Sequence, residues 1–374
     1  MQIAVAHEWL VRYAGSERVV DELLAAFPGA ELLTTMVEPA RVPPRLRSAR
    51  PSVLQRIPGA TRHHEWLLPL MPLSWRLRGP VVDVAAVVSS SHACAKAVRV
   101  GTGIPHLCYC HTPMRYAWDF ESEQVRFPPA IRPAARLAMS WFRHWDRRTA
   151  ENVDVFVANS TAVKKRIEAF YGRPATVVHP PVRTDRFTPG GQRDDFFLYV
   201  GRLVPYKRAD LVVEAFAGLD ERLLVVGEGQ LGQRLQARAS PNVSFVGEVD
   251  EDRLLELFRT ARALVFPAEE DFGIAMAEAQ ACGTPVIGLD RGGAPDIVDD
   301  GVTGWLLPEA TVDQVQEAVR RAAREELDSA EIRRRAERFS SERFRKEMVA
   351  AVETTVAVAR EPGGLDRLRR DGLG

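Results

Sequence analysis

The chain has 374 residues, and 46% of them are hydrophobic, which excludes a protein too small or too polar to build a core. Its 50 basic and 50 acidic residues balance to a net charge of zero. Residues 1–190, however, hold 25 Lys and Arg against 16 Asp and Glu, a difference of +9, whereas residues 191–374 hold 25 against 34, a difference of −9. We therefore expect a soluble protein of two domains whose first half meets an anionic partner.

The basic excess is concentrated in residues 41–78, where eight Arg face a single acid, Glu65. Within this segment, residues 66–75 form an apolar stretch that prolines interrupt and that is too short to cross a bilayer. These features predict peripheral contact with an anionic membrane surface. A buried apolar segment flanked by solvated Arg, in a chain that is rich in Arg throughout, is the alternative. The segment contains no recognisable nucleic-acid-binding module, so a nucleic acid is not an expected partner.

The cysteines and the N-terminus bear on cofactors and location. Cys94, Cys108, Cys110 and Cys282 form no CxxC pair, so we expect no metal site and reduced thiols. Residues 1–8 lack a basic region and break their apolar run early, which predicts a first strand and not a signal peptide. We expect a cytoplasmic protein, peripheral at the inner face of the plasma membrane if the basic segment binds lipid.

In the first half, apolar strand-like runs alternate with helical patterns, which is typical of α/β layers around a parallel sheet. The expected elements are strands at 3–6, 81–88, 106–110 and 153–158, and helices at 16–27 and 162–171. Ligands of such sheets bind beyond the carboxyl ends of the strands. Gly15 is therefore a candidate for contact with a phosphate, and His111 for contact with a substrate oxygen. A structural His111 bonded to backbone is the alternative.

After a linker at 188–192, a second α/β series follows. The expected elements are strands at 196–200, 223–226, 243–246, 264–266 and 285–287, helices at 253–262, 273–282, 312–324 and 341–359, and a loose tail at 361–374. Gly201 follows the first of these strands, with Arg202 and Lys207 close behind. A planar guanidinium and a compact ammonium past a strand end suit a diphosphate. Surface charge at a helix start is the alternative.

Two further patterns in this half imitate known motifs. Residues 227–232 fit GxGxxG between a strand and a helix, and Glu248 follows at about the distance of a ribose-binding acid, which together resemble a dinucleotide fingerprint. Its position downstream of another phosphate candidate makes a cofactor fold less favoured. Residues 250–252, Asp-Glu-Asp, imitate a DxD metal signature, but they precede a periodic helix, so Asp250 is better interpreted as its N-cap.

The most informative stretch is residues 264–287, a short strand, an acidic loop and a helix of small residues. A helix N-terminus carries unpaired N–H groups and partial positive charge, so the backbone near Phe272, Gly273 and Ile274 suits a phosphate or a sugar oxygen. Glu270 in the loop and Glu278 in the helix can both accept hydrogen bonds from hydroxyl groups. A solvated acidic loop that favours a helix start is the alternative.

These patterns together resemble a retaining glycosyltransferase of family 4, with a GT-B fold of two facing Rossmann-like doubly wound domains and a cleft between them. The resemblance covers residues 1–345. It is carried in the second half by Glu270 and Glu278, by 201–207, by 285–293 and by 301–304. The first half is similar to the O-antigen mannosyltransferase branch, which uses GDP-mannose, through 7–11, 89–92, 111–118 and 206–208.

The resemblance implies three parts: an acceptor-binding domain at 1–187, a nucleotide-sugar-binding domain at 188–345, and a C-terminal helix at 346–374 that packs back before the loose tail. It also implies residue roles. These are Glu270 and His111 on the transferred sugar, Glu278 on the ribose, Arg202, Lys207 and Gly15 on the diphosphate, backbone at Phe272, Gly273 and Ile274 on sugar or phosphate, and backbone near Gly229 and Val249 on the base. Two departures stand out: Ala14-Gly15-Ser16 replaces the paired glycines that are common in the family, and Asp296 replaces a usual Glu.

The implied activity is retaining, metal-independent transfer of a hexose, with GDP-mannose as the nucleotide-sugar donor and a glycan or lipid-linked acceptor. No cofactor is expected. Three alternatives stay open: a GT-B sugar-nucleotide epimerase, an NAD-dependent oxidoreductase that rests on residues 227–232, and a catalytically silent nucleotide-sugar-binding protein.

Overall fold

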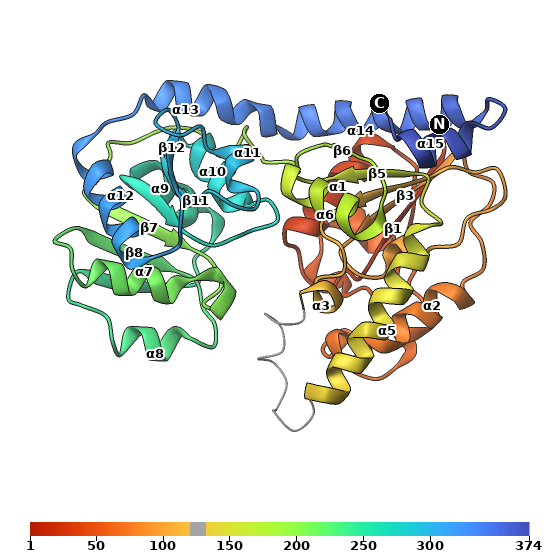
Figure 1. Ribbon diagram of the computed structural model, residues 1–374, viewed down its shortest axis with the longest axis horizontal. Helices are drawn as coiled ribbons and strands as arrows, with labels where there is room; N and C mark the ends of the chain where they lie inside the picture. Colours follow the sequence, from red (N-terminus) through yellow and green to blue (C-terminus); the bar gives the residue numbers. More distant parts are fainter. Residues whose placement is uncertain (120–131, 374) are drawn as a thin grey trace. The chain divides into compact units, whose positions relative to one another are not determined.

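The computed structural model describes residues 1–119 and 132–373. Within this part, the chain forms two compact units, one of residues 1–181 and 342–374 and one of residues 182–341 (Figure 1). The sequence analysis set the corresponding boundaries at 187 and 345. Residues 120–131, which belong to the predicted first domain, lie outside the described residues.

The first unit contains a parallel six-stranded sheet with the order β2-β1-β3-β4-β5-β6. Its strands are β1 (Ile3–His7), β2 (Glu31–Thr34), β3 (Ala86–Ser91), β4 (His106–Cys110), β5 (Val155–Ala158) and β6 (Ala175–Val177). The chain places β2 on one side of β1 and then continues on the other side with β3. The order therefore reverses between β1 and β3, and ligands of open α/β sheets bind beyond the carboxyl ends of strands at such a point.

Helices cover this sheet and close its core. They are α1 (Gly15–Ala26), α2 (Met71–Leu77), α3 (Arg115–Trp118), α5 (Arg132–Ala150), α6 (Thr161–Tyr171), α14 (Ser341–Ala359) and α15 (Gly364–Asp371). Phe344 of α14 and Leu368 of α15 are buried in the same cluster as Ile3 and Val5 of β1. The expectation of a loose tail at 361–374 is therefore wrong for 364–371, because Leu368 gives this short helix a buried contact, and Arg369 adds an ion pair with Asp154.

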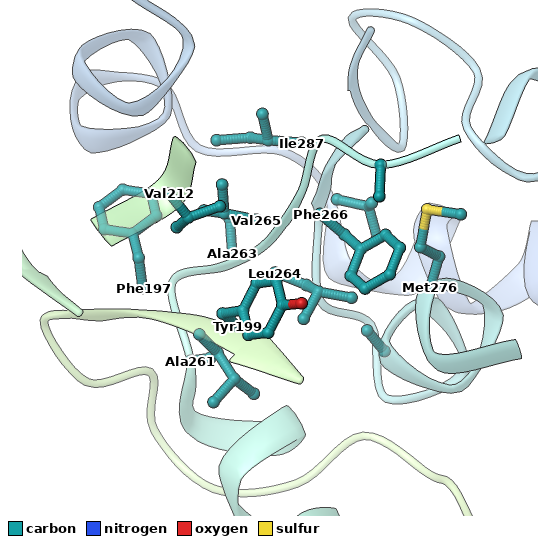
Figure 2. Packing of buried hydrophobic residues seen from close by; sticks show 14 of the residues in the cluster. Phe197, Tyr199, Val212, Ala261, Ala263, Leu264, Val265, Phe266, Met276 and Ile287 are labelled. Atoms are coloured by element: carbon teal, nitrogen blue, oxygen red, sulfur yellow. The ribbon is translucent and has the colours of Figure 1, made fainter. Parts of the chain in front are cut away.

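The second unit contains another parallel six-stranded sheet, with the order β12-β11-β10-β7-β8-β9. Its strands are β7 (Phe196–Val200), β8 (Arg222–Val226), β9 (Val243–Gly247), β10 (Ala263–Phe266), β11 (Val286–Leu289) and β12 (Gly304–Leu307). Here the order reverses between β7 and β10. Figure 2 shows their buried side chains, with the rings of Tyr199 and Phe266 stacked at 5.7 Å between centroids.

The helices of the second unit are α7 (Ala209–Phe216), α8 (Gly232–Gln236), α9 (Glu251–Thr260), α10 (Ile274–Ala281), α11 (Ala294–Ile297), α12 (Val312–Arg324) and α13 (Ser329–Ala336). Asp250 is the N-cap of α9, and its Oδ1 accepts from the Arg253 N–H at 2.8 Å. The N-cap interpretation of this acidic triplet is thus confirmed, since the side chain satisfies a helix N–H that would otherwise lack a partner.

One strand is displaced from its predicted position. The apolar run at 81–88 predicted a strand, but β3 spans Ala86–Ser91, and Val81 forms only an isolated bridge with Val100. Asp83 has a φ of 60°, in the left-handed region that is costly within a strand. The strand instead continues through Ser89, Ser90 and Ser91, which are all buried. Hydrophobicity alone placed the strand too early in the chain, because the last three residues of β3 are serines.

A buried carboxylate holds the loop that follows β3. Glu8 Oε1 accepts from the Ser91 hydroxyl at 2.9 Å and from the backbone N–H groups of His92 and Ala93 at 3.1 and 2.8 Å. Its Oε2 accepts from the Cys94 N–H at 2.8 Å. Burial raises the pKa of Glu8, but His92 and the backbone N–H groups outweigh burial and hold it below its ordinary value. Glu8 therefore fixes the end of β3 as an ionised group.

We expect Glu8→Ala to lower the free energy of unfolding by about 3 kcal/mol or more, because several donors to a charged acceptor lose their partner inside the protein. Because the folded-state pKa is depressed, this stabilisation is present above the unfolded pKa and disappears as the pH falls through the folded pKa. Urea unfolding at pH 7 and at pH 3–4 measures both effects. The exposed Glu65→Ala is the matched control, expected within about 0.5 kcal/mol of wild type. Equal stability of the two variants at pH 7 would contradict the account.

Candidate functional site

The first unit gathers imidazoles where its strand order reverses. His7 ends β1, His92 follows β3, and His111 follows β4. The ring centroids of His7 and His92, and those of His92 and His111, are each 6.1 Å apart. Trp9 lies edge-on to His92 at 4.9 Å. The predicted site residue His111 thus lies beside two histidines that the sequence analysis did not single out as functional.

Hydrogen bonds link the rings of His7 and His111 through Ser90. The Ser90 Oγ lies 2.8 Å from His111 Nε2 and 3.2 Å from His7 Nδ1. His7 Nδ1 is also 3.1 Å from the Ser90 carbonyl oxygen. On its other side, His7 Nε2 lies 3.9 Å from Glu17 Oε1. Hydrogen bonds thus connect His7 through Ser90 to His111, while the Glu17 carboxylate lies near His7 Nε2 but beyond hydrogen-bond distance.

The pKa shifts of His92 and His111 favour the neutral form of these two imidazoles. Burial, with further contributions from His92 and His7, holds the pKa of His111 well below its ordinary value. Burial also lowers the pKa of His92, although the Glu8 carboxylate opposes it. A neutral imidazole presents one N–H donor and one acceptor, which suits hydroxyl groups better than anions.

Gly15, the predicted phosphate contact, is the first residue of α1, and Ala14 is its N-cap. The Ala14 N–H donates to Glu17 Oε2 at 3.0 Å, so the Glu17 side chain satisfies the backbone N–H of the N-cap residue. The first N–H groups of this helix point along its axis toward the region beyond β1. The phosphate role of Gly15 stays a prediction.

In the second unit, the loops after β7 and β10 meet through an ion pair. Lys207 Nζ lies 2.6 Å from Glu270 Oε1, with 17% and 16% of the two side chains exposed. The ammonium also lies 5.3 Å from the centroid of the Phe266 ring and 5.5 Å from that of Tyr206. The Tyr199 hydroxyl donates to the Lys207 carbonyl at 3.0 Å. Two predicted site residues, 63 positions apart, thus meet at the point where the second sheet reverses.

Arg202 contacts the same tyrosine as Lys207, with its guanidinium carbon 6.0 Å from the centroid of the Tyr206 ring. Its Nη2 donates to the Tyr206 hydroxyl at 2.6 Å, and the side chain is exposed. From the sequence, Arg202 and Lys207 are both predicted to meet a diphosphate, the first as a planar fork and the second as a point charge. The structure gives them different surroundings: Lys207 is half-buried and held by a carboxylate, whereas Arg202 is held by a phenol at the surface.

The helix after the acidic loop begins as predicted. Gly273 is the N-cap of α10 with a φ of 101°, a backbone conformation that favours glycine. The N–H groups at such a helix start have no partner within the helix, and they favour electron-rich oxygens. Glu278 lies within α10 and is 5% exposed. Its placement separates it from Glu270, which lies in the loop.

A glycine pair packs directly on the acidic loop. A Cβ on Gly292 would lie 2.3 Å from the Glu270 carbonyl oxygen, and one on Gly293 would lie 2.4 Å from Phe272 Cα. The Gly293 N–H donates to the Glu270 carbonyl at 2.9 Å. The sequence analysis used these glycines only for the resemblance, although their role is steric: any side chain there would push the loop that carries Glu270.

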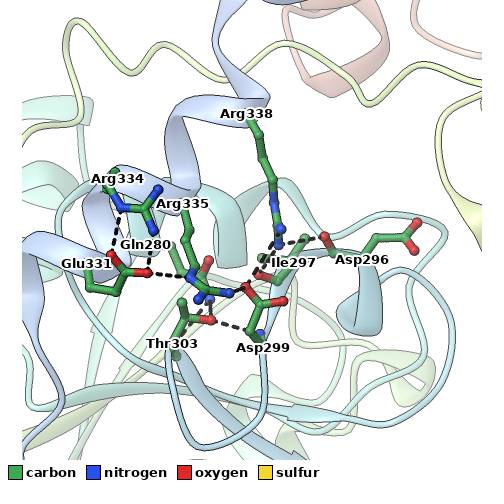
Figure 3. Close-up of polar contacts among 9 residues, drawn as sticks. All are labelled: Gln280, Asp296, Ile297, Asp299, Thr303, Glu331, Arg334, Arg335 and Arg338. Carbon is green, nitrogen blue, oxygen red and sulfur yellow. Dashed lines mark hydrogen bonds and ion pairs between the residues drawn. The ribbon is translucent and has the colours of Figure 1, made fainter.

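An arginine network supports the segment after α11 (Figure 3). Arg335 forms ion pairs with Asp299 and Glu331, each at 2.6 Å. Arg338 donates to the carbonyl of Asp296 at 3.0 Å, so the backbone at this departure from the family pattern is fixed. Thr303 connects the network to α10, because Gln280 Nε2 donates to its hydroxyl at 2.9 Å. The network thus reaches the C-terminal end of α10, where Gln280 lies.

The GxGxxG pattern has a packing explanation. A Cβ on Gly227 would lie 2.1 Å from the Gly201 carbonyl oxygen, and one on Gly229 would lie 2.5 Å from that of Leu203. These glycines therefore allow the loop after β8 to pack against the loop after β7. The following helix, α8, has only five residues, and Glu248 is exposed. The dinucleotide interpretation is not favoured. Val249, which was predicted near the base, is half-buried.

The acidic residues 250–252 form no metal site in this geometry. Asp250 caps α9, Glu251 forms an ion pair with Arg183, and Asp252 forms one with Arg186. Within residues 1–119 and 132–373, no group of three or more His, Cys, Asp and Glu is arranged to hold a metal ion. The four cysteines are free and buried.

Sequence reasoning missed Ser90, His7 and Glu8 as parts of the site. The run of four polar residues at 89–92 directly after an apolar strand was a usable signal, because buried polar residues need partners. Glu8 offered none, since a lone acid after a strand is usually solvated.

Comparison with known proteins agrees with this geometry. A family model described as Glycosyltransferase Family 4 matches residues 13–186, and one described as Glycosyl transferases group 1 matches residues 183–339. A D-inositol 3-phosphate glycosyltransferase of Geodermatophilus obscurus is 34% identical over 241 residues, which cover 55% of this chain and 54% of the relative. Its counterpart from Mycobacterium avium is 32% identical over 200 residues, 46% and 47% of the two chains. The match thus spans about half the length of these relatives.

Solved structures show the same architecture. Anabaena Alr3699/HepE, determined in complex with UDP and glucose, has a TM-score of 0.65 at 15% identity, covering 93% of this chain and 99% of its own. Sucrose-phosphate synthase from Thermosynechococcus elongatus has a TM-score of 0.72 at 18% identity, covering 96% and 99%. At such identities the likeness shows the fold alone. The two family models follow one another along residues 13–339, so the chain is similar to glycosyltransferases in both of its units, and it has the GT-B fold.

Proposed function

We propose that the protein is a retaining, metal-independent glycosyltransferase that moves a hexose from a nucleotide sugar to a glycan or lipid-linked acceptor. The observation that carries the proposal is the ion pair of Lys207 with Glu270 where the second sheet reverses. Glu270 belongs to the loop that leads from β10 into α10, and Gly273 at the end of this loop is the N-cap of the helix. A cation, a carboxylate and a set of helix N–H groups are the groups that a sugar diphosphate needs.

The chemistry follows from charge. When the bond between sugar and diphosphate breaks, negative charge develops on the leaving oxygen. The Lys207 ammonium and the helix N–H groups stabilise that charge, and Glu270 keeps the ammonium in place before the donor binds. Because 16% of Glu270 is exposed, its carboxylate can also accept from sugar hydroxyls. Glu278 would accept from the ribose, and Gly229 and Val249 would meet the base through backbone groups.

We propose that the reaction needs no metal ion, because cationic side chains can balance the charge of the diphosphate. Charge on the diphosphate is met by Lys207 and by Arg202, while the acids at 250–252 are engaged in a helix cap and two ion pairs. These contacts support the proposal, because a cation bound by these acids would have to displace the helix cap and the ion pairs.

For the donor, we propose GDP-mannose, since the first half resembles the mannosyltransferase branch at 7–11 and 89–92. A UDP-sugar is the competing donor, because the related Anabaena protein was solved with UDP and with UDP-glucose. The names of the curated relatives add a phosphorylated inositol as an acceptor to be tested beside glycans and lipids. An epimerase would share the donor site, but the resemblance does not favour it.

We expect Lys207→Ala to lower donor turnover by about 100-fold or more, the scale of losing one charge stabiliser in the transition state. Release of nucleoside diphosphate from GDP-mannose and UDP-glucose, with a bacterial lipid extract and inositol phosphate as acceptors, measures the effect.

The exposed Arg234→Ala, in α8 of the same unit, is the control for a general loss of positive charge and is expected to keep wild-type turnover. Near wild-type turnover by a folded Lys207→Ala variant would refute the role of Lys207. Epimerised nucleotide sugar without any transfer product would favour the epimerase instead.

We also propose that the basic segment 41–78 contacts an anionic membrane surface. Leu70, Leu73 and Leu77 follow α-helical spacing along α2 and are exposed by 44%, 53% and 63%. Trp66, in the preceding 3-10 helix His64–Leu70, is exposed by 85%. The opposite face is buried through Met71 and Trp75. The buried face fits the alternative of a buried apolar segment, and the exposed side chains of the other face support the proposal of membrane contact.

Charge around this row fits a lipid surface. Arg56, Arg62 and Arg76 are exposed, whereas Arg45 and Arg50 pair with acids. Within the described residues, no helix is both long and apolar enough to span a bilayer. The row has the form of an interfacial element, with apolar side chains and nearby cations.

Sedimentation with vesicles tests this contact. We expect binding to equimolar phosphatidylglycerol and phosphatidylcholine at low salt, weaker binding at high salt, and none to phosphatidylcholine alone. Replacing the four exposed apolar residues by Ser should lower the partition coefficient by about tenfold or more, since burial of even one side chain of this kind is worth about 1.5–3 kcal/mol. Val246→Ser, an exposed apolar residue of β9, is the matched control. Unchanged binding of the fourfold variant would rule out this surface.

A further inference from the structure

The hydrogen bonds from His7 through Ser90 to His111 constrain where the protons lie. His7 Nδ1 is 3.1 Å from the Ser90 carbonyl oxygen, which can only accept a hydrogen bond. A bare Nδ1 would place two lone pairs against each other at that distance. His7 Nδ1 therefore carries a proton, whether His7 is neutral or charged through its contact with Glu17.

The orientation of the Ser90 hydroxyl follows. Its Oγ lies 3.2 Å from His7 Nδ1, which is a donor, and 2.8 Å from His111 Nε2. The hydroxyl accepts from His7 and must place its own proton elsewhere. Of the partners that the structure gives this hydroxyl, His111 Nε2 is the one that can accept it.

We propose that Ser90, oriented by His7, is a positioning residue that fixes His111 as the neutral imidazole protonated on Nδ1. His111 Nε2 is then occupied as an acceptor inside the protein. The Nδ1–H is the group left to meet a substrate, and it can donate a hydrogen bond but cannot act as a base. This deepens the proposed function, because it makes His111 a hydrogen-bond donor to a sugar oxygen.

The surroundings of His111 are consistent with a fixed neutral ring. His92 and His7 are the titratable neighbours that contribute to its electrostatics, and both disfavour a positive charge. The ring of Tyr109 packs edge-on at 5.2 Å, and its hydroxyl donates to the Val178 carbonyl at 3.0 Å. The low pKa of His111 agrees with the hydrogen-bond geometry, on which the assignment rests.

The same strand contains an internal reference. Ser89 Oγ lies 2.8 Å from His106 Nε2, and His106 Nδ1 lies 3.3 Å from the Asn152 carbonyl oxygen. The same reasoning predicts that His106 is also protonated on Nδ1, and burial lowers the pKa of His106 to about 4. Ser89 and Ser90 thus each orient a different imidazole, from opposite faces of β3.

Two-bond proton–nitrogen correlation spectra of the full chain with ¹⁵N-labelled histidine test the proposal directly, because they distinguish bare from protonated ring nitrogens. His111→Asn identifies the signal of His111 by its loss. We expect a protonated Nδ1 and a bare Nε2, unchanged between pH 5.5 and pH 8. A ring that titrates with a pKa near 6.5, or a protonated Nε2, would overturn the proposal.

Variants separate positioning from general structure. Ser90→Ala should shift His111 toward the Nε2-protonated form and leave His106 unchanged, whereas Ser89→Ala should perturb His106 and spare His111. Ser90→Thr, which keeps the hydroxyl, should restore the wild-type spectrum of His111. If His111 keeps its Nδ1 proton in a folded Ser90→Ala variant, Ser90 is not the positioning residue. None of these readouts needs a donor or an acceptor, so failure here is distinct from failure of the proposed function.

Discussion

The reversal of strand order in each sheet is the constraint on which the rest of the structure depends. Beyond β1 and β3, and again beyond β7 and β10, neighbouring loops leave the sheet in opposite directions and keep a space open at the carboxyl ends. In the second unit, the ion pair of Lys207 with Glu270 bridges that point. In the first unit, the imidazoles of His7, His92 and His111 collect there. In each unit, predicted site residues therefore lie where the strand order reverses.

Buried polar groups give these sites their precision. Glu8 is fully buried, yet it is satisfied by one hydroxyl and three backbone N–H groups, so its burial stabilises one conformation of the loop after β3. Ser90 connects two imidazoles in the same way. In the second unit the corresponding role is steric, since Gly292 and Gly293 let one loop lie against the backbone of Glu270 and Phe272. The first unit thus fixes its loop by hydrogen bonds to buried polar groups, and the second unit fixes its loop by close packing on glycines.

Most of the fold was predictable from sequence, because buried parallel strands are short apolar runs between turn residues. The limits of β7, α12 and α14 agree with the predicted ranges. The errors have physical causes. The strand β3 ends in buried serines that hydropathy treats as loop, and α15 is a charged sequence that is held by buried Leu368 and by the ion pair of Arg369 with Asp154. The acidic loop was identifiable from its spacing and glycine. The pairing of Lys207 with Glu270 was not, because it depends on which strands are neighbours.

The most direct test of the central claim, that the loops after β7 and β10 hold a nucleotide sugar, is a melting-temperature panel of wild type and Glu270→Gln with GDP, UDP, ADP, GDP-mannose, UDP-glucose and NAD. Ligands that bind only the folded protein raise its melting temperature with the logarithm of their concentration over Kd. The account predicts a rise with one nucleoside diphosphate and its sugar conjugate, with the extra contribution of the sugar reduced in Glu270→Gln. A rise with NAD alone, or with none of the diphosphates, would contradict it.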